Sequence, residues 1–306
     1  HLKRQPSFGI AQKGQKSRVI FSGLPMGHEF TSFILALLQV SGRPPKVDED
    51  IIERIKKIDK TIDLETYVSL TCHNCPDVVQ AFNIMAVLNP NITHTMIEGG
   101  MYQDEVKAKG IMSVPTVYKD QEEFTSGRAT IEQLVEKLDG PLDAEAFADK
   151  GVYDVLVIGG GPAGNSAAIY AARKGLKTGL LAETFGGQVI ETVGIENMIG
   201  TLYTEGPKLM AQVEEHTKSY NVDIIKSQLA TGIEKKELIE VTLANGAVLQ
   251  AKTAILALGA KWRNINVPGE DEFRNKGVTY CPHCDGPLFE GKNVAVIGGG
   301  NSGLEA

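Results

Sequence analysis

Hydrophobic positions along the chain fall into segments with a period of two and segments that repeat every three or four residues. Between residues 61 and 140 they predict the order strand, helix, strand, helix, strand, strand, helix. The clearest helix follows Cys75, with Val78, Val79, Phe82, Met85 and Leu88 on one face. Strands are predicted at Glu65–Thr71 and Ile92–Glu98, a hairpin at Thr116–Tyr118 and Glu123–Ser126, and a final helix that contains Ile131 to Leu138.

Residues 5–40 repeat the second half of this pattern. Gln5-Pro-Ser-Phe parallels Val114-Pro-Thr-Val, and the hairpin and helix that follow it parallel those after Pro115. The half-copy contains no cysteine. Because it begins in the middle of a fold, we expect further residues before His1.

A glycine-rich motif follows the strand predicted at Tyr153–Ile158. It reads G-x-G-x-x-G, opens an alanine-rich helix, and is followed by a second strand that ends at Glu183. Strand, motif, helix, strand and acid are the parts of a dinucleotide site: the helix start holds a pyrophosphate and the acid holds a ribose. The predicted cofactor-binding residues here are Gly159, Gly161, Pro162, Ala163, Gly164 and Glu183.

The motif recurs about 140 residues later, after a strand predicted at Asn293–Ile297. Its predicted cofactor-binding residues are Gly298, Gly300, Asn301, Ser302 and Gly303. Two such motifs predict two dinucleotides, and the usual redox pairing is FAD with NAD(P)H. The second motif reaches Ala306 within its own helix, so we also expect sequence beyond residue 306.

All four cysteines lie in two C-x-x-C pairs, Cys72/Cys75 and Cys281/Cys284. Four-cysteine zinc sites usually place their pairs about 15–20 residues apart. Here complete predicted domains separate the pairs, so redox chemistry is favoured over zinc, and no metal site is predicted. Cys72 lies at a strand–helix junction, where the helix dipole favours a thiolate, and is the predicted attacking thiol.

Composition excludes some classes of partner. The formal net charge is −7, which argues against a nucleic-acid or anionic-membrane surface. The longest apolar stretch, Phe33–Leu38, is far too short to span a bilayer, and no secretory signal opens the chain. A cytoplasmic location is the resulting expectation.

Several segments resemble known families. The order of strands and helices in residues 61–140, with C-x-x-C at the first strand–helix junction, resembles thioredoxin. This resemblance implies that the peptide bond before Pro115 is cis and that Pro115 faces the cysteines. Four further segments resemble those of the low-molecular-weight thioredoxin reductases: Glu183-Thr-Phe-Gly-Gly-Gln-Val, Ile195-Glu-Asn, Ala257-Leu-Gly-Ala and Cys281-Pro-His-Cys-Asp-Gly. The tandem thioredoxin-like region narrows the resemblance to the flavoprotein family of the alkyl hydroperoxide reductases. Leu258 departs from the threonine usual in that family.

This resemblance implies a relay in which NADH reduces FAD, FAD reduces Cys281–Cys284, and that pair reduces Cys72–Cys75. The last pair would reduce a peroxiredoxin, and NADPH stays open as the donor. The resemblance places Cys284 nearer the flavin, with Asp285 beside it as an acid–base group, and implies a homodimer. It adds Gly186, Gly187, Gln188, Asn197, Ala257 and Gly259 to the FAD site.

The predicted fold is α/β, with a thioredoxin-like region followed by a Rossmann-type FAD domain and the start of a Rossmann-type NAD(P) domain. Its divisions are residues 1–50 (partial cysteine-less copy), 51–138 (redox domain), 139–151 (linker), 152–266 (FAD domain) and 267–306 (start of the NAD(P)H domain with the second redox pair). Two alternatives stay open: a thioredoxin reductase fused to its own thioredoxin, and a non-enzymatic redox sensor.

Overall fold

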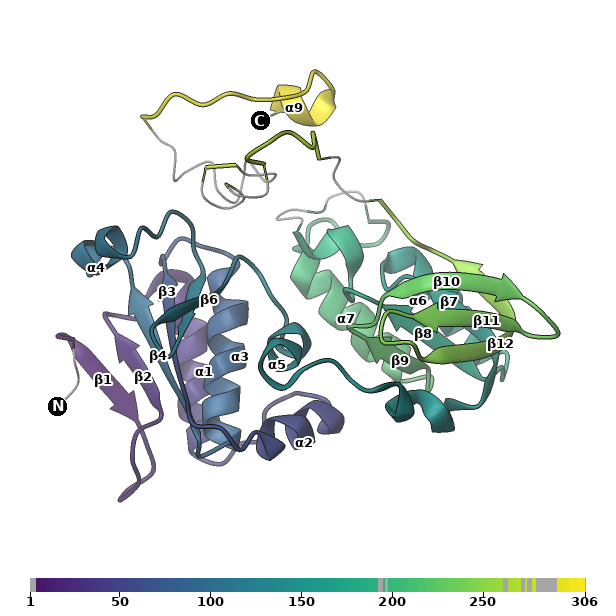
Figure 1. Ribbon diagram of the computed structural model, residues 1–306, viewed down its shortest axis with the longest axis horizontal. Coiled ribbons are helices and arrows are strands. Elements are labelled where there is room, and N and C mark those ends of the chain that lie inside the picture. The colour runs from purple at the N-terminus through teal and green to yellow at the C-terminus, as the bar shows by residue number, and fades with distance from the viewer. Residues whose placement is uncertain are drawn as a thin grey trace. The chain divides into compact units, whose positions relative to one another are not determined.

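The computed structural model describes residues 4–191, 195, 198–260, 264–270, 273, 277–278 and 291–305. The chain divides into two compact units, one of residues 1–139 with 264–306 and the other of residues 140–263 (Figure 1). Each unit has its own hydrophobic core.

A six-stranded mixed sheet organises the first unit, in the order β1-β2-β4-β3-β5-β6. Strands β2, β4 and β3 run parallel to one another, while β1, β5 and β6 are antiparallel to their neighbours. Strands from both sides of residue 50 belong to this one sheet, so the predicted half-copy and the predicted redox domain share it. Its strands are β1 (Ser7–Ile10), β2 (Val19–Ser22), β3 (Ile62–Val68), β4 (Ile92–Glu98), β5 (Thr116–Lys119) and β6 (Glu122–Ser126).

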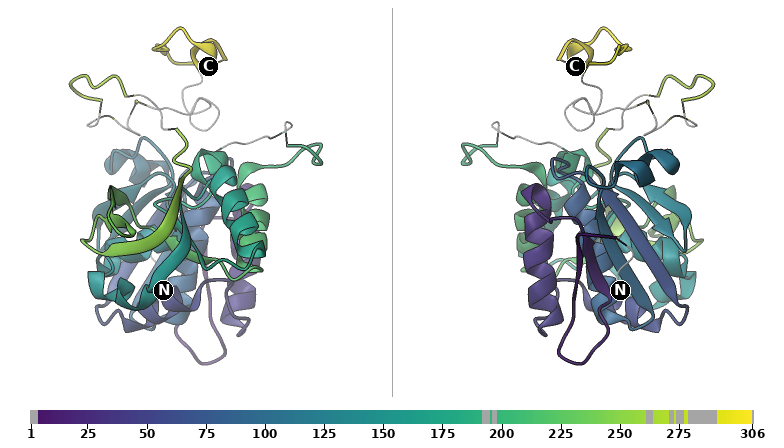
Figure 2. Two further views of the ribbon diagram at one scale, coloured as in Figure 1. Left: turned by 90° about the vertical axis from the view of Figure 1, so that its right-hand side faces the viewer. Right: turned by 90° about the vertical axis from the view of Figure 1, so that its left-hand side faces the viewer.

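The helices of this unit follow the periodicity of the sequence. Helix α3 packs against β3 and β4 and against α1, which runs beside the β1–β2 hairpin (Figure 2). Helix α2 is an addition to the sequence prediction, because its three isoleucines stand in a short, highly charged segment. The helices are η1 (Gly27–Glu29), α1 (Phe30–Val40), α2 (Glu49–Lys57), α3 (Cys75–Leu88), α4 (Gln103–Ala108) and α5 (Ile131–Asp139).

Strand β3 is buried on both faces because its side chains alternate between two clusters. Leu64 and Val68 enter the main core with α3, whereas Tyr67 enters a smaller cluster with Ile97 and Tyr118. The predicted strand extends to Thr71, but β3 ends at Val68. The chain then turns, and helix α3 begins at Cys75.

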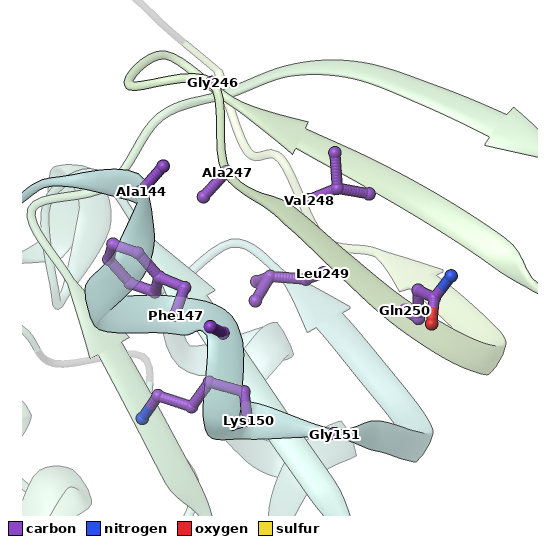
Figure 3. Close-up of a pocket in the computed structure, with 10 residues that line it drawn as sticks. Ala144, Phe147, Lys150, Gly151, Gly246, Ala247, Val248, Leu249 and Gln250 are labelled. Atoms are coloured by element: carbon purple, nitrogen blue, oxygen red, sulfur yellow. The ribbon is translucent and has the colours of Figure 1, made fainter.

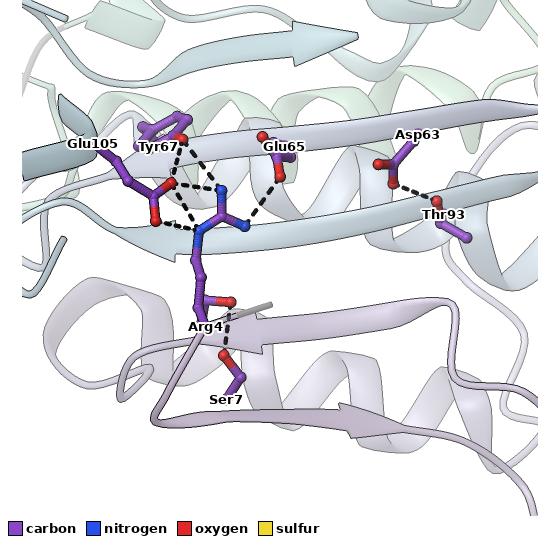
Figure 4. A network of polar contacts seen from close by, with 8 residues as sticks. Arg4, Ser7, Asp63, Glu65, Tyr67, Thr93 and Glu105 are labelled. Carbon is purple, nitrogen blue, oxygen red and sulfur yellow. Dashed lines mark hydrogen bonds and ion pairs between the residues drawn. The ribbon is translucent and has the colours of Figure 1, made fainter. Parts of the chain in front are cut away.

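A polar network fastens the segment before β1 to the second face of β3 (Figure 4). The Arg4 guanidinium donates to Glu105 on α4 at 2.7 Å and to the buried carboxylate of Glu65 at 3.0 Å. Tyr67 donates to the same Glu105 carboxylate at 3.0 Å. This charge-assisted network holds together segments about 100 residues apart in sequence.

The structure agrees with the predicted repeat and with the predicted cis proline. The bond before Pro115 is cis, and so is the bond before Pro6, its counterpart in the half-copy.

The β5–β6 hairpin turns at Asp120 and Gln121, both with positive φ, as its two-residue loop requires.

The second unit contains another six-stranded sheet, in the order β10-β11-β12-β7-β8-β9. Its parallel part, β12-β7-β8-β9, has α6 as the crossover between β7 and β8, and a meander of β10 and β11 extends it. This is a Rossmann-type arrangement, as the glycine motif predicts. Its elements are β7 (Val152–Ile158), α6 (Pro162–Arg173), β8 (Thr178–Ala182), η3 (Gly187–Glu191), α7 (Gly206–Lys218), β9 (Asp223–Lys226), β10 (Ala230–Lys235), β11 (Ile239–Leu243) and β12 (Val248–Leu256).

Most of the predicted linker, residues 139–151, packs against the second unit. It contains the 3₁₀ helix η2 (Ala144–Lys150), whose Phe147 is only 6% exposed in the core. Lys150 pairs with Asp223 at 2.9 Å, and Leu142 accepts a hydrogen bond from Asn245 at 2.8 Å. A single aromatic side chain anchors this segment. The sequence of the linker therefore shows no helical or strand periodicity of apolar residues.

A cavity of about 300 Å³ lies between η2 and the start of β12 (Figure 3). Phe147 and Leu249 line it together with Lys150 and Gln250. It adjoins Gly151, before β7, whereas the glycine motif follows the other end of that strand. The cavity is therefore separate from the predicted nucleotide site.

The strand predicted before the second glycine motif is not present in the described residues. Residues 293–299 form no strand, because a strand needs a neighbour to accept its hydrogen bonds and no described strand pairs with them. Helix α9 (Asn301–Glu305) follows as predicted.

Candidate disulfide and nucleotide sites

Cys72 and Cys75 form a disulfide at the start of α3. The backbone N–H of Cys75 donates to Sγ of Cys72 at 3.1 Å. Sγ of Cys72 also lies 3.7 Å from the carbonyl oxygen of Val114, the residue before the cis proline. The predicted site residues Cys72, Cys75 and Pro115 are thus brought together.

The two sulfurs differ in access. Cys75, the first residue of α3, is fully buried in the core, whereas Cys72 is partly exposed. A partner's sulfur can therefore reach only Cys72 without rearrangement of the core. After reduction, the Cys75 N–H and the positive end of the α3 dipole would stabilise a thiolate at Cys72.

A buried carboxyl group, Glu29, lies beside this centre and is absent from the sequence prediction. It belongs to η1, which packs against α3, and its side chain is fully buried. Burial raises the pKa of Glu29 to about 7; the Ser32 hydroxyl opposes this shift and the negative charge of Asp77 adds to it. Among the described residues, no side chain or backbone group makes a hydrogen bond of good geometry to either carboxyl oxygen, so the effect of burial exceeds that of Ser32. Glu29 therefore exchanges a proton near neutral pH, next to the helix that begins at Cys75.

The half-copy also contacts the C-x-x-C loop directly. The N–H of His28 donates to the carbonyl oxygen of Leu70 at 3.1 Å. The His28 and His73 rings lie 4.1 Å apart between centroids. His73 thus contacts a residue of the half-copy. The sequence alone does not predict this contact.

The first glycine motif forms the turn predicted for it. Gly159 has φ of +121°, which disfavours a residue with a side chain. A Cβ on Gly164 would collide with the carbonyl oxygen of Gly159, so this glycine is needed for close packing of helix on loop. Pro162 and Ala163 are exposed in the first turn of α6.

Gly161 differs from its neighbours because the protein itself does not require a glycine there. Its φ and ψ are −75° and −177°, and a Cβ would meet nothing within 4 Å. The space beside it is at the start of α6, where free N–H groups and the helix dipole favour an anion. This open cradle fits the pyrophosphate of a dinucleotide.

Other predicted cofactor residues gather at the same edge of the sheet. The Gly186 N–H donates to the carbonyl oxygen of Gly160 at 2.9 Å, and Gly187 lies against Gly161. Glu183 follows β8, and Ala257 and Gly259 follow β12, so both segments lie at carboxyl ends of parallel strands. The Ala257 N–H donates to the carbonyl oxygen of Ile158, and Gln188 is exposed on η3. Ligands of such sheets bind at this edge.

The second motif repeats the local geometry of the first. Gly298 has φ of +126°, close to that of Gly159. A Cβ on Gly303 would collide with the carbonyl oxygen of Gly298, as Gly164 would with Gly159. Gly300 and Asn301 lie between them, and Asn301 and Ser302 begin α9.

Four predicted site residues lie outside the described residues: Asn197, Cys281, Cys284 and Asp285. Within the described ranges, no helix is long and apolar enough to cross a membrane. The same part of the chain contains no group of three or more His, Cys, Asp or Glu residues arranged for a metal ion.

These two sites, a thioredoxin-like disulfide and a Rossmann-type cradle, define the class of the protein. The family described as pyridine nucleotide-disulphide oxidoreductase matches residues 153–306, and a thioredoxin domain matches residues 62–139. The chain belongs to the pyridine nucleotide-disulphide oxidoreductase family and also contains a thioredoxin domain.

Two named relatives are similar to nearly the whole of this chain. A Bacillus subtilis protein named NADH dehydrogenase is 63% identical over all of this chain and 60% of its own length. The F subunit of the alkyl hydroperoxide reductase from Pseudomonas aeruginosa is 56% identical over 99% of this chain and 60% of its own. The chain thus spans about three fifths of the length of these relatives.

Among solved structures, a domain of alkylhydroperoxide reductase AhpF from Enterococcus faecalis is 33% identical to this chain. The match covers 45% of this chain and 66% of that one, with a TM-score of 0.43.

Proposed function

We propose that this chain is part of an NADH-dependent flavoprotein that reduces the peroxiredoxin component of an alkyl hydroperoxide reductase. The observation that carries the proposal is the Cys72–Cys75 disulfide at the start of α3, on the same chain as the dinucleotide cradle. Relatives named as the F subunit of alkyl hydroperoxide reductase support it.

The cradle in the second unit is proposed to hold FAD. The loop at Gly159–Gly164 would receive the pyrophosphate, Glu183 the ribose, and the segments at Gly186–Gln188, Asn197 and Ala257–Gly259 would line the rest of the cofactor. FAD bound there would accept two electrons from NADH and deliver them to a protein disulfide. The motif at Gly298–Gly303 would bind the nicotinamide dinucleotide, NADH in preference to NADPH.

Two thiol–disulfide exchanges would then carry the electron pair outward. The reduced pair Cys281/Cys284 would attack the Cys72–Cys75 disulfide through Cys281, and Cys284 would displace Cys72 from the mixed disulfide. That exchange leaves Cys72 and Cys75 as thiols and re-forms the Cys281–Cys284 disulfide. Asp285 is proposed to move the proton at Cys284.

Cys72 would next attack the disulfide of the peroxiredoxin, and Cys75 would resolve the mixed disulfide. Each turn would release a reduced peroxiredoxin and restore Cys72–Cys75. Glu29 is proposed to take up or supply the proton at Cys75. A homodimer in the cytoplasm completes the proposal.

Turnover with defined partners tests this function. The full-length protein should oxidise NADH when peroxiredoxin and an alkyl hydroperoxide are both present, and should do so far more slowly with free thioredoxin as the acceptor. Preference for free thioredoxin would favour a thioredoxin reductase fused to its own thioredoxin. A protein without flavin that does not oxidise NADH would favour the redox sensor.

A further inference from the structure

Asn165 lies directly behind the glycine-rich loop. It is in the first turn of α6, and its side chain is fully buried. Its Nδ2 donates to the carbonyl oxygens of Gly160 at 2.7 Å and Gly161 at 3.0 Å. None of the sequence motifs requires an asparagine at this position.

The hydrogen bond to Gly160 determines where the next N–H points. A peptide group is planar and trans, so its carbonyl and N–H point in opposite directions. Because Asn165 holds the Gly160 carbonyl inward, the N–H of Gly161 faces away from the core. Gly161 also leaves open space, because a Cβ there would meet nothing within 4 Å.

The same carbonyl joins two glycine segments. Besides Asn165, the Gly160 oxygen accepts a hydrogen bond from the Gly186 N–H at 2.9 Å. Asn165 therefore holds one peptide that orients both the loop at Gly159–Gly164 and the segment at Gly186–Gly187.

Thr217 on α7 contacts the oxygen end of the Asn165 amide. Its hydroxyl lies 2.7 Å from Oδ1 of Asn165 and 2.8 Å from the carbonyl oxygen of Val213, and it is fully buried. The carbonyl oxygens of Gly160 and Gly161 can only accept, so they select the amide nitrogen of Asn165, and the Thr217 hydroxyl donates to the amide oxygen on the other side. Oδ1 then faces Thr217, and Nδ2 faces the glycine loop.

We propose that Asn165 and Thr217 are positioning residues that preorganise the loop for the pyrophosphate of FAD. This inference rests on the proposed function, which assigns FAD to this loop. Asn165 uses its amide to aim a backbone N–H at the anion, and Thr217 supports that amide through a hydrogen bond to Oδ1. Asn165 contacts the loop and Thr217 contacts Asn165, so the expected effect of the pair is on cofactor affinity.

Flavin affinity tests this inference directly. The full-length protein is stripped of flavin, and the dissociation constant for FAD is measured by titration calorimetry. Asn165→Ala should raise the dissociation constant by about 5- to 30-fold, the worth of one or two hydrogen bonds. Thr217→Val should raise it by about 5-fold, whereas Thr217→Ser, which keeps the hydroxyl, should restore affinity to within about 2-fold.

A matched control separates positioning from stability. Asn245 in the same unit also bridges two backbone groups, donating to Leu142 and accepting from Ala247, but far from the glycine loop. Asn245→Ala should lower the melting temperature and leave the dissociation constant for FAD unchanged. Equal FAD affinity in wild type, Asn165→Ala and Thr217→Val would overturn the inference alone. A wild-type protein that binds no FAD would overturn the proposed function as well.

Discussion

The backbone N–H of Cys75 points at Sγ of Cys72 from 3.1 Å, at the amino end of α3. After reduction of the disulfide, this hydrogen bond would be charge-assisted and about twice as strong as a neutral one, so it would favour a thiolate at Cys72 over a thiol. The exposed sulfur is therefore also the activated one, which gives the pair a direction of attack.

Replacement of this sulfur should divide the reaction into two parts. Cys72→Ser should leave the bleaching of flavin by NADH unchanged and reduce peroxiredoxin turnover by at least about a thousandfold, because serine is not a nucleophile for disulfides. Stopped-flow absorbance and coupled NADH oxidation measure the two steps. Loss of flavin bleaching to the same extent would reject the order of the relay.

Glu29 should make the stability of the thioredoxin-like unit depend on pH. Its pKa is about 7 in the fold and 4.5 as the reference value, so the folded state keeps a proton that the unfolded chain releases between these values. Its contribution to the free energy of unfolding is complete below pH 4.5 and falls by about 3 kcal/mol as the pH rises to 7. Glu29→Gln should remove that fall.

Hydrogen exchange of α3 amides between pH 4.5 and 8, corrected for the intrinsic exchange rate, measures this effect. Glu53→Gln is the control, because Glu53 is exposed and pairs with Lys56 on its own helix. The same fall in wild type and Glu29→Gln would show that the Glu29 carboxyl is not the group that titrates.

Two glycines of one motif should fail in different ways. Gly161→Ala should leave the unfolding temperature of the apoprotein unchanged, since a Cβ there meets nothing, but should weaken FAD binding by about tenfold or more. Gly164→Ala should destabilise the second unit by about 1–3 kcal/mol, because its Cβ meets the Gly159 carbonyl. Identical behaviour of the two variants in calorimetry would contradict the open cradle at Gly161.

Removal of the Phe147 ring should free the segment before β7. Phe147→Ala should cost about 3 kcal/mol and make residues 140–151 sensitive to limited proteolysis, because this ring anchors η2 in the core. Val248→Ala, at a half-exposed position on the same cavity, should change neither property. Unaltered protection of the segment in Phe147→Ala would show that other contacts hold it.

Local patterns predicted the secondary structure well where the repeat of apolar residues was long. Strand β4 has its predicted bounds, helix α3 contains the whole apolar face predicted after Cys75, and the glycine turn at Gly159 follows from its motif alone. Strand β3 ends three residues early because the chain turns after Val68, where the Cys72 N–H donates to the carbonyl oxygen of Ser69 at 3.0 Å.

Contacts between distant segments were not predictable in the same way. Glu29 is one carboxylate among many until the fold buries it against α3, and no spacing marks it. Arg4, Glu65 and Glu105 meet only because alternation in β3 brings Glu65 to the face under α4. Phe147 is a single aromatic residue in a charged segment, which a periodic pattern cannot reveal.

The central claim is that the two C-x-x-C pairs form one relay fed by NADH. Thiol counting after anaerobic reduction tests it most directly: the full-length, denatured protein is titrated with a thiol reagent after treatment with excess NADH. The account predicts that all four cysteines become free thiols, because electrons pass from Cys281/Cys284 to Cys72/Cys75. Two free thiols, with the Cys72–Cys75 disulfide intact by mass spectrometry, would contradict it.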